Sequence, residues 1–253
     1  MAEHLRIELD TYRFHSPRLG VPVLIFEVTA KVTDDLFLLV PRHAIVDLLN
    51  GVLGRAQQKT GDFDFDLYGY HFMSNHLHLL IGVVELVDKS LVLEWTQREI
   101  ARRINRYHGR TGQLLTPNHA IQITSLPHAL ERMRYVMGQA TAQLLSRHPA
   151  DDVFACANPA LLRGEPLAGT FVHANGVREA VTVRLDRLPG LDDLSPRAHR
   201  DLMWQLADAI AAEQAAAGKK AGLPVPDPEA ARRVDPWTRP RQRDRSPAPV
   251  VHG

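Results

Sequence analysis

The feature that most constrains the fold is a pair of short apolar runs separated by a turn at Ser74 and Asn75. The residues alternate in the manner of a strand over 63–72 and do so again over 76–84. Two strands joined by so short a turn pair in antiparallel fashion. This segment therefore predicts a β-hairpin, and the rest of the sheet has to be built on its two edges.

The segments on either side of the hairpin predict three helices and two further strands. Apolar and β-branched residues favour strands over 21–29 and 120–124, and helical spacing favours helices over 41–61, 86–107 and 127–146. The resulting order, β-α-β-β-α-β-α, matches the split β-α-β plan. We therefore expect an α+β fold of the ferredoxin-like or RRM-like type, with a four-stranded antiparallel sheet and helices on one face.

The chain after residue 146 is less regular. It contains possible strands at 170–172 and 180–185, whose packing the pattern does not determine, and a predicted alanine-rich helix that begins at Pro196. From Gly218 onward prolines alternate with arginines, a composition that favours no packed structure. We expect a first domain over 1–146, a partly helical extension over 147–217 and a disordered tail over 218–253.

The composition restricts the class of protein. Apolar residues make up 45% of the chain, which allows a hydrophobic core, and the net charge of +1 does not by itself indicate a nucleic-acid-binding protein. The single cysteine, Cys156, excludes a disulfide framework and a cysteine-rich zinc module. The first ten residues are too polar for a signal peptide, and no stretch reaches the ~18 apolar residues of a membrane span. We expect a cytoplasmic protein that does not bind membranes.

His76 and His78 are the most informative polar residues. They lie two positions apart on a predicted strand, so both imidazoles project from one face. Two neutral imidazoles side by side form half of the ligand shell of a divalent metal. The alternative is a pair of surface histidines on a half-exposed strand. By contrast, no spacing gives His71 a partner or Cys156 a nearby acid–base group, so we expect neither to form a site.

The string Phe72-Met-Ser-Asn-His-Leu-His-Leu-Leu resembles the HUH motif of the single-tyrosine transposases, in particular the REP-associated tyrosine transposases. The resemblance implies that His76 and His78 bind Mg²⁺ or Mn²⁺. It also implies a nucleophilic tyrosine on a later helix and an amide ligand four positions further on. Tyr135 and Gln139 match this pair and share one helix face. The alternative is that they only pack and solvate that helix.

A second stretch, over 103–112, resembles the family's segment between its basic helix and the next strand, so the resemblance extends over about 21–146. It implies that the domain over 1–146 is an HUH-type catalytic domain. The segments after Gly112 and after Gln139 differ from the family pattern. The implied activity is that of a single-stranded DNA endonuclease and strand transferase, in which Tyr135 forms a 5′-phosphotyrosine intermediate. The implied partner is single-stranded or hairpin DNA, and the implied assembly is a monomer or a homodimer.

Basic residues cluster on one face of the predicted helix over 86–107 and just beyond it. Such a face is predicted to bind DNA phosphates, although arginines on a helix are also often simply solvated. The residues in question are Arg98, Arg102, Arg103, Arg106 and Arg110.

The sequence leaves other functions open. One is a domesticated, noncatalytic binder of structured single-stranded DNA, which the two differing segments favour. A second is an unrelated metal-dependent hydrolase that uses the same His-x-His pair, but the chain lacks the repeated strand–helix units of a barrel. A third is an RNA-recognition module, whose strands would expose aromatic residues where this chain has histidines.

Overall fold

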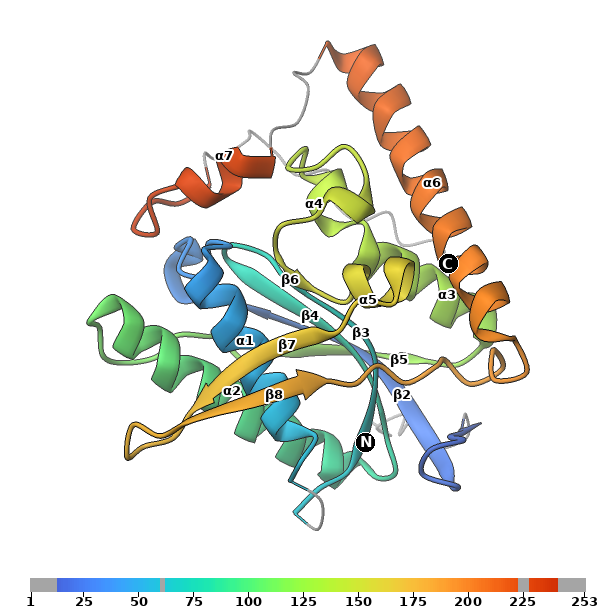
Figure 1. Cartoon of the computed structure of the whole chain (residues 1–253), viewed down its shortest axis with the longest axis horizontal. Coiled ribbons are helices and arrows are strands. Elements are labelled where there is room, and N and C mark those ends of the chain that lie inside the picture. Colours follow the sequence, from blue (N-terminus) through green and yellow to red (C-terminus); the bar gives the residue numbers. More distant parts are fainter. Residues whose placement is uncertain (1–12, 60–61, 223–227, 241–253) are drawn as a thin grey trace, which may run out of the picture.

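An antiparallel sheet forms the centre of the protein (Figure 1). The structure is a computed structural model that describes residues 13–59, 62–222 and 228–240. In chain order the strands of the sheet are β1 (Phe14–His15), β2 (Pro22–Lys31), β3 (Phe65–Phe72), β4 (His76–Val83), β5 (His119–Ile123) and β6 (Ala155–Cys156).

The four long strands follow the predicted plan. β2 pairs with both β4 and β5, and β3 pairs with β4, which gives the antiparallel order β5-β2-β4-β3. The expected α+β fold with an antiparallel sheet is therefore confirmed. Two short strands were not predicted. β1 pairs with the start of β2, and β6 pairs with the end of β3.

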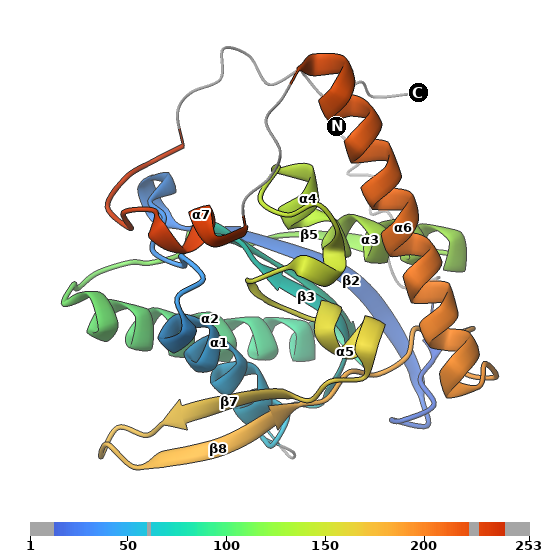
Figure 2. The same cartoon turned by 45° about the horizontal axis from the view of Figure 1, so that its top comes forward.

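Helices cover both faces of the sheet (Figure 2). α1 (His43–Ala56) and α2 (Leu86–His108) lie on one face, and α3 (Leu126–Met137) and α4 (Gln139–Ala142) lie on the other. Neighbouring residues of β3 contact different helices, because successive residues of a strand point to opposite faces of the sheet. Tyr70 Oη donates to Asn50 Oδ1 of α1 at 2.9 Å, whereas a Cβ on Gly69 would lie 3.2 Å from Met133 Sδ of α3. The expectation of helices on one face therefore holds only for α1 and α2.

Local sequence sets the ends of these helices. α2 begins at a capping box and ends at Gly109, which adopts the left-handed conformation with φ 63°. α3 begins at Ser125, whose hydroxyl accepts a hydrogen bond from the third residue after it. The single helix expected over 127–146 is interrupted at Gly138, so Gln139 becomes the first residue of α4.

A second, two-stranded sheet packs on α1. Its strands are β7 (Leu167–Val172) and β8 (Arg178–Val183). They overlap the possible strands at 170–172 and 180–185, whose packing the sequence did not determine. Arg103 of α2 contacts both strand β7 and the aromatic ring of Phe171 within it. Its Nη2 donates to the carbonyl oxygen of Val172 at 2.6 Å, and its guanidinium lies 3.8 Å from the centre of the Phe171 ring.

Two further helices lie beside α3 and α4 (Figure 1). They are α5 (Asn158–Arg163) and α6 (Pro196–Ala221), and short 3₁₀ turns occur at Thr33–Asp35 and Pro149–Asp151. Trp204 of α6 donates its indole N–H to the carbonyl oxygen of Leu162 in α5 at 2.8 Å. Within the described ranges, no helix combines the length and the apolar character that a membrane crossing requires.

Part of the segment expected to be a disordered tail is packed. The short helix α7 (Pro228–Arg233) buries Ala231, and the backbone N–H of Phe37 donates to the carbonyl oxygen of Thr238 at 3.1 Å. The expectation of no packed structure therefore does not hold for 228–240. Residues 223–227 and 241–253 of the same segment lie outside the described part of the chain.

The contact between α1 and β7 can be tested at Gly51. A Cβ on this residue would lie 2.2 Å from the carbonyl oxygen of Thr170, so the backbone would have to move. We expect Gly51→Ala to lower the free energy of unfolding by about 1–3 kcal/mol, as overpacking does, in a urea denaturation experiment.

Gly218→Ala in α6 is the matched control, because nothing lies within 4 Å of its added Cβ. It should leave stability unchanged or raise it by up to about 1 kcal/mol, since alanine is the better helix former. Equal stability of the Gly51→Ala variant and the wild-type protein would contradict this packing.

Candidate functional site

β4 carries His76 and His78 on the face of the sheet that α3 covers. Their ring centres are 5.0 Å apart and their planes are inclined at 89°. In the ladders, His78 is paired with Thr29 of β2 and with His71 of β3. Because paired residues project to the same face, a row of polar side chains crosses the sheet at this level.

His78 is held by a buried carboxylate. Its Nδ1 lies 2.8 Å from Oε1 of Glu27 and 3.1 Å from the hydroxyl of Thr29. We assign the proton to Nδ1, because a carboxylate only accepts. Nε2 of His78 is buried and has no hydrogen-bond partner within the described residues. Burial lowers the pKa of His78 more than Glu27 raises it, so the ring is neutral and carries a free lone pair.

Glu27 in turn bonds to α3. Its second oxygen accepts a hydrogen bond from Arg132 Nη2 at 2.8 Å, and its side chain is only 1% exposed. Burial alone would raise the pKa of Glu27. The hydrogen bond with His78 and the charge of Arg132 outweigh this effect and lower the pKa below its usual value, so the carboxyl is ionised.

His76 is also held in the neutral form. Burial, followed by the neighbouring His78, lowers the pKa of His76 to about 4. Its Nδ1 lies 2.8 Å from Oδ1 of Asn75, and the side chain of Gln139 partly offsets the lowering of the His76 pKa. Neutral imidazoles are the form that binds metals.

Tyr135 and Gln139 complete the cluster. Gln139 is buried, and its Nε2 donates to the backbone carbonyl of Tyr135 at 3.0 Å, which leaves the amide oxygen as an acceptor. The Tyr135 ring is 45% exposed, and its centre lies 5.2 Å from that of His78. The guanidinium of Arg132 lies 4.3 Å from the centre of the same ring. The structure thus brings together the four residues selected from the sequence as nucleophile and ligands.

A cleft of about 240 Å³ opens beside Tyr135 and Gln139. Arg134 and Gly138 lie on the α3 side of this cleft, and α6 forms the facing wall with Ile210, Glu213 and Gln214. Arg134 and Glu213 form an ion pair across it. The exposed face of the tyrosine is therefore next to a cleft that is open to solvent.

The five arginines predicted to bind DNA lie elsewhere. They belong to α2 or follow it, and α2 lies on the opposite face of the sheet from α3 (Figure 2). Glu99 forms ion pairs with Arg98, Arg102 and Arg103, and Arg110 bonds to Asn105. With Val172 and His173, three of the arginines line a groove of about 410 Å³; these are Arg102, Arg103 and Arg106. Their DNA-binding role stays a prediction.

Sequence reasoning missed Glu27 and Arg132. The glutamate between Phe26 and Val28 in β2 was a signal, because charged residues are almost never fully buried unless paired. Arg132 lies three positions before Tyr135 and therefore on the same side of α3.

Comparison with known proteins gives matches of structure alone. No protein-family model and no curated protein matches the sequence. A REP-associated tyrosine transposase bound to a REP hairpin is similar over 66% of this chain and 90% of its own, with 15% identity and a TM-score of 0.45. A putative transposase from Deinococcus radiodurans R1 is similar over 47% of this chain and 92% of its own, with 17% identity and a TM-score of 0.34.

Proposed function

We propose that this protein is a divalent-metal-dependent endonuclease and strand transferase of single-stranded DNA, with Tyr135 as the nucleophile. The observation that carries the proposal is the convergence of an exposed tyrosine on two neutral, carboxylate- or amide-oriented histidines. These residues come from β4 and α3, which are about 60 residues apart in the sequence. The geometry of this chain's own side chains, and not the distant structural matches, supports the assignment.

The donors of the cluster fit a divalent cation. The Nε2 lone pair of His78 is buried without a partner among the described residues, and an unsatisfied buried polar atom costs free energy that a bound ion would remove. With His76 and the amide oxygen of Gln139 it forms a set of two nitrogens and one oxygen. Mn²⁺ or Mg²⁺ accepts such a set and keeps positions open for water and phosphate. A cation bound there would polarise the scissile phosphate.

The reaction follows from the position of the tyrosine. The hydroxyl oxygen of Tyr135 forms a bond to the scissile phosphorus, and the bond from phosphorus to the 3′-oxygen breaks. In the net reaction the tyrosine proton ends on the 3′-oxygen, which leaves a free 3′-hydroxyl and a 5′-phosphotyrosine. Attack by another 3′-hydroxyl reverses these steps and joins strands. Arg132 keeps a positive charge beside the ring throughout.

DNA would approach from the exposed side of Tyr135. The cleft between α3 and α6 is next to the tyrosine and offers polar side chains, among them Gln214, to a nucleotide beside the scissile phosphate. The groove between α2 and the β7–β8 hairpin lies on the other side of the sheet. We assign Arg98, Arg102, Arg103, Arg106 and Arg110 to DNA that extends beyond the reacting phosphate.

Metal binding is tested with Mn²⁺ in a direct binding titration. We expect His78→Ala to abolish binding, because it removes the buried lone pair, and Gln139→Ala to weaken it. Glu27→Gln should lower the affinity about 10–100-fold, since a carboxylate that orients a ligating histidine contributes by that factor. His128→Ala, on the first turn of α3, is the control and should bind like the wild-type protein. Unchanged Mn²⁺ binding by the His78→Ala variant would refute this ligand assignment.

The nucleophile is tested by incubating the protein with labelled hairpin-forming single-stranded DNA and Mn²⁺, followed by a denaturing gel. We expect a covalent adduct that EDTA prevents and that Tyr135→Phe abolishes, while DNA retention on a filter is unchanged. Tyr107→Phe is the matched control, because Tyr107 is 42% exposed, against 45% for Tyr135, but lies on α2.

The same assay separates the competing functions. Retention of DNA without any adduct would identify a noncatalytic binder of structured single-stranded DNA. Metal-dependent cleavage that persists in the Tyr135→Phe variant would identify a hydrolase in which water, not tyrosine, attacks the phosphate.

The arginine assignment is tested by the salt dependence of DNA retention. Arg106 is exposed and lines the groove, so we expect Arg106→Ala to weaken binding. The slope of log K against log salt should become shallower by about 0.7 for each phosphate of a single strand that the variant no longer neutralises. Arg200→Ala on the exposed side of α6 should leave the slope unchanged. An equal slope for Arg106→Ala and the wild-type protein would remove this residue from the interface.

A further inference from the structure

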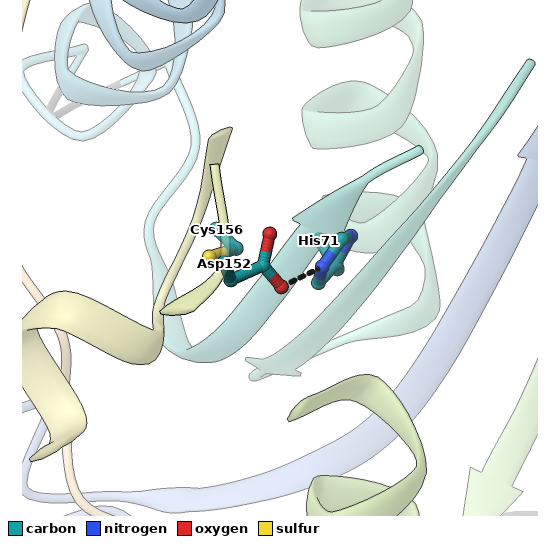
Figure 3. Close-up of side chains that lie close together, drawn as sticks. All are labelled: His71, Asp152 and Cys156. Carbon is teal, nitrogen blue, oxygen red and sulfur yellow. Dashed lines mark hydrogen bonds and ion pairs between the residues drawn. The ribbon is translucent and has the colours of Figure 1, made fainter. Parts of the chain in front are cut away.

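A second cluster of ligand-type side chains lies on the same face of the sheet (Figure 3). It consists of His71, Asp152 and Cys156, whose donor atoms all lie within 4.8 Å of one another. Sequence spacing had given neither His71 nor Cys156 a partner, whereas in the fold both lie beside Asp152. Cys156 of β6 is paired in register with His71 of β3, and Asp152 lies in the segment leading into β6.

The cluster is closed to solvent, and its hydrogen bonds converge on Asp152. The side chains of His71 and Asp152 are 0% and 1% exposed, and Cys156 is 2% exposed. Nε2 of His71 lies 2.7 Å from Oδ2 of Asp152, and Sγ of Cys156 lies within 4.8 Å of both groups. Asn158 Nδ2 donates to Asp152 at 3.3 Å, and the N–H of Phe154 donates at 2.9 Å. The imidazole of His71 and the thiol of Cys156 thus both lie beside the carboxyl group of Asp152.

The cluster offers a carboxyl group, an imidazole and a thiol to a cation. His71 is the only ion-pair partner of Asp152 among the described residues, and an imidazole balances a carboxylate only when it is protonated. A buried carboxylate whose neighbours are all neutral is costly. A divalent cation bound by one thiolate, one carboxylate and one neutral imidazole forms a neutral centre, which removes this cost.

The donor types select the kind of cation. Thiolate sulfur with imidazole nitrogen suits Zn²⁺ and its substitutes, whereas Mg²⁺ prefers oxygen. Zinc bonds of 2.0–2.3 Å in a tetrahedron place ligand atoms roughly 3.3–3.8 Å apart. The His71–Asp152 separation of 2.7 Å would have to open by about 1 Å or less, which side-chain rotation can supply.

We propose that His71, Asp152 and Cys156 bind a thiophilic divalent cation of the Zn²⁺ class, at a structural site distinct from the His76–His78 pair. The cation replaces the thiol proton, which is released to solvent, and the Nε2 proton of His71 moves to Nδ1. That Nδ1 is buried and has no hydrogen-bond partner within the described residues, so it is free to carry the proton. Binding fastens β6 and the segment before it to the edge strand β3.

The single cysteine makes a spectroscopic test unambiguous. Co²⁺ is added to the full-length protein, and the near-ultraviolet sulfur-to-cobalt charge-transfer band is recorded. We expect this band to saturate at one Co²⁺ per chain, to appear with release of one proton, and to disappear when Zn²⁺ is added. Any such band can come only from Cys156.

Variants separate this site from the one proposed for catalysis. Cys156→Ser should abolish the band, and Asp152→Asn should lower Co²⁺ affinity more than about tenfold, because a ligand contributes at least as much as a group that orients one. The double variant His76→Ala, His78→Ala should keep the band at full intensity. Circular dichroism of each metal-free variant establishes that it is folded.

The outcomes decide the proposal without reference to DNA cleavage. Absence of the band in folded wild-type protein, or Co²⁺ binding without proton release, overturns it. Loss of the band in the His76→Ala, His78→Ala variant also overturns it, because the two sites would then be one. If Cys156→Ser does not fold, the wild-type protein still gives an answer, since Zn²⁺ should raise its Tm and remove the cobalt band.

Discussion

The buried carboxylate of Glu27 is the constraint on which the candidate site depends. Glu27 belongs to β2. Its carboxylate bonds to His78 of β4 and to Arg132 of α3, so it connects three elements. A buried charge is tolerated only when it is paired and hydrogen-bonded, so each of these contacts is needed. The same contacts fix the tautomer of His78 and hold α3 against the sheet. Arg132, which balances the charge of Glu27, also lies over the ring of Tyr135. The ion pair of Glu27 therefore helps to hold Tyr135 beside His78.

The strand order of the core followed from local patterns, but the placement of the helices did not. A hairpin and two β-α units leave few ways to order four strands. The face that α3 covers depends on contacts across the sheet. One signal was present in the sequence, because Leu79, Leu80 and Ile81 of β4 form a continuous apolar run and strands of that kind are covered on both faces. The glycine at the break also has a long-range contact, since a Cβ on Gly138 would lie 3.1 Å from Ile210 of α6.

The candidate site also combines features that local sequence predicts with features that depend on long-range contacts. The His-x-His pair is local, and its common face follows from strand geometry alone. Tyr135 and Gln139 were selected through a resemblance, and the structure places them beside the histidines. The carboxylates were not predictable from spacing, because Glu27 and His78 are 51 residues apart and His71 and Asp152 are 81 apart. Only the register of the sheet brings such residues together.

One structural device occurs twice on this face of the sheet. His78 and His71 are paired across neighbouring strands, and each is oriented by a buried carboxylate. Their surroundings differ. His78 lies next to an exposed tyrosine and an open cleft, whereas the cluster of His71, Asp152 and Cys156 has no side chain more than 2% exposed. A phosphodiester can reach a cation only at the first position. A cation at the second can act only on the stability of the strands that hold it, which is why we propose catalysis for one and a structural role for the other.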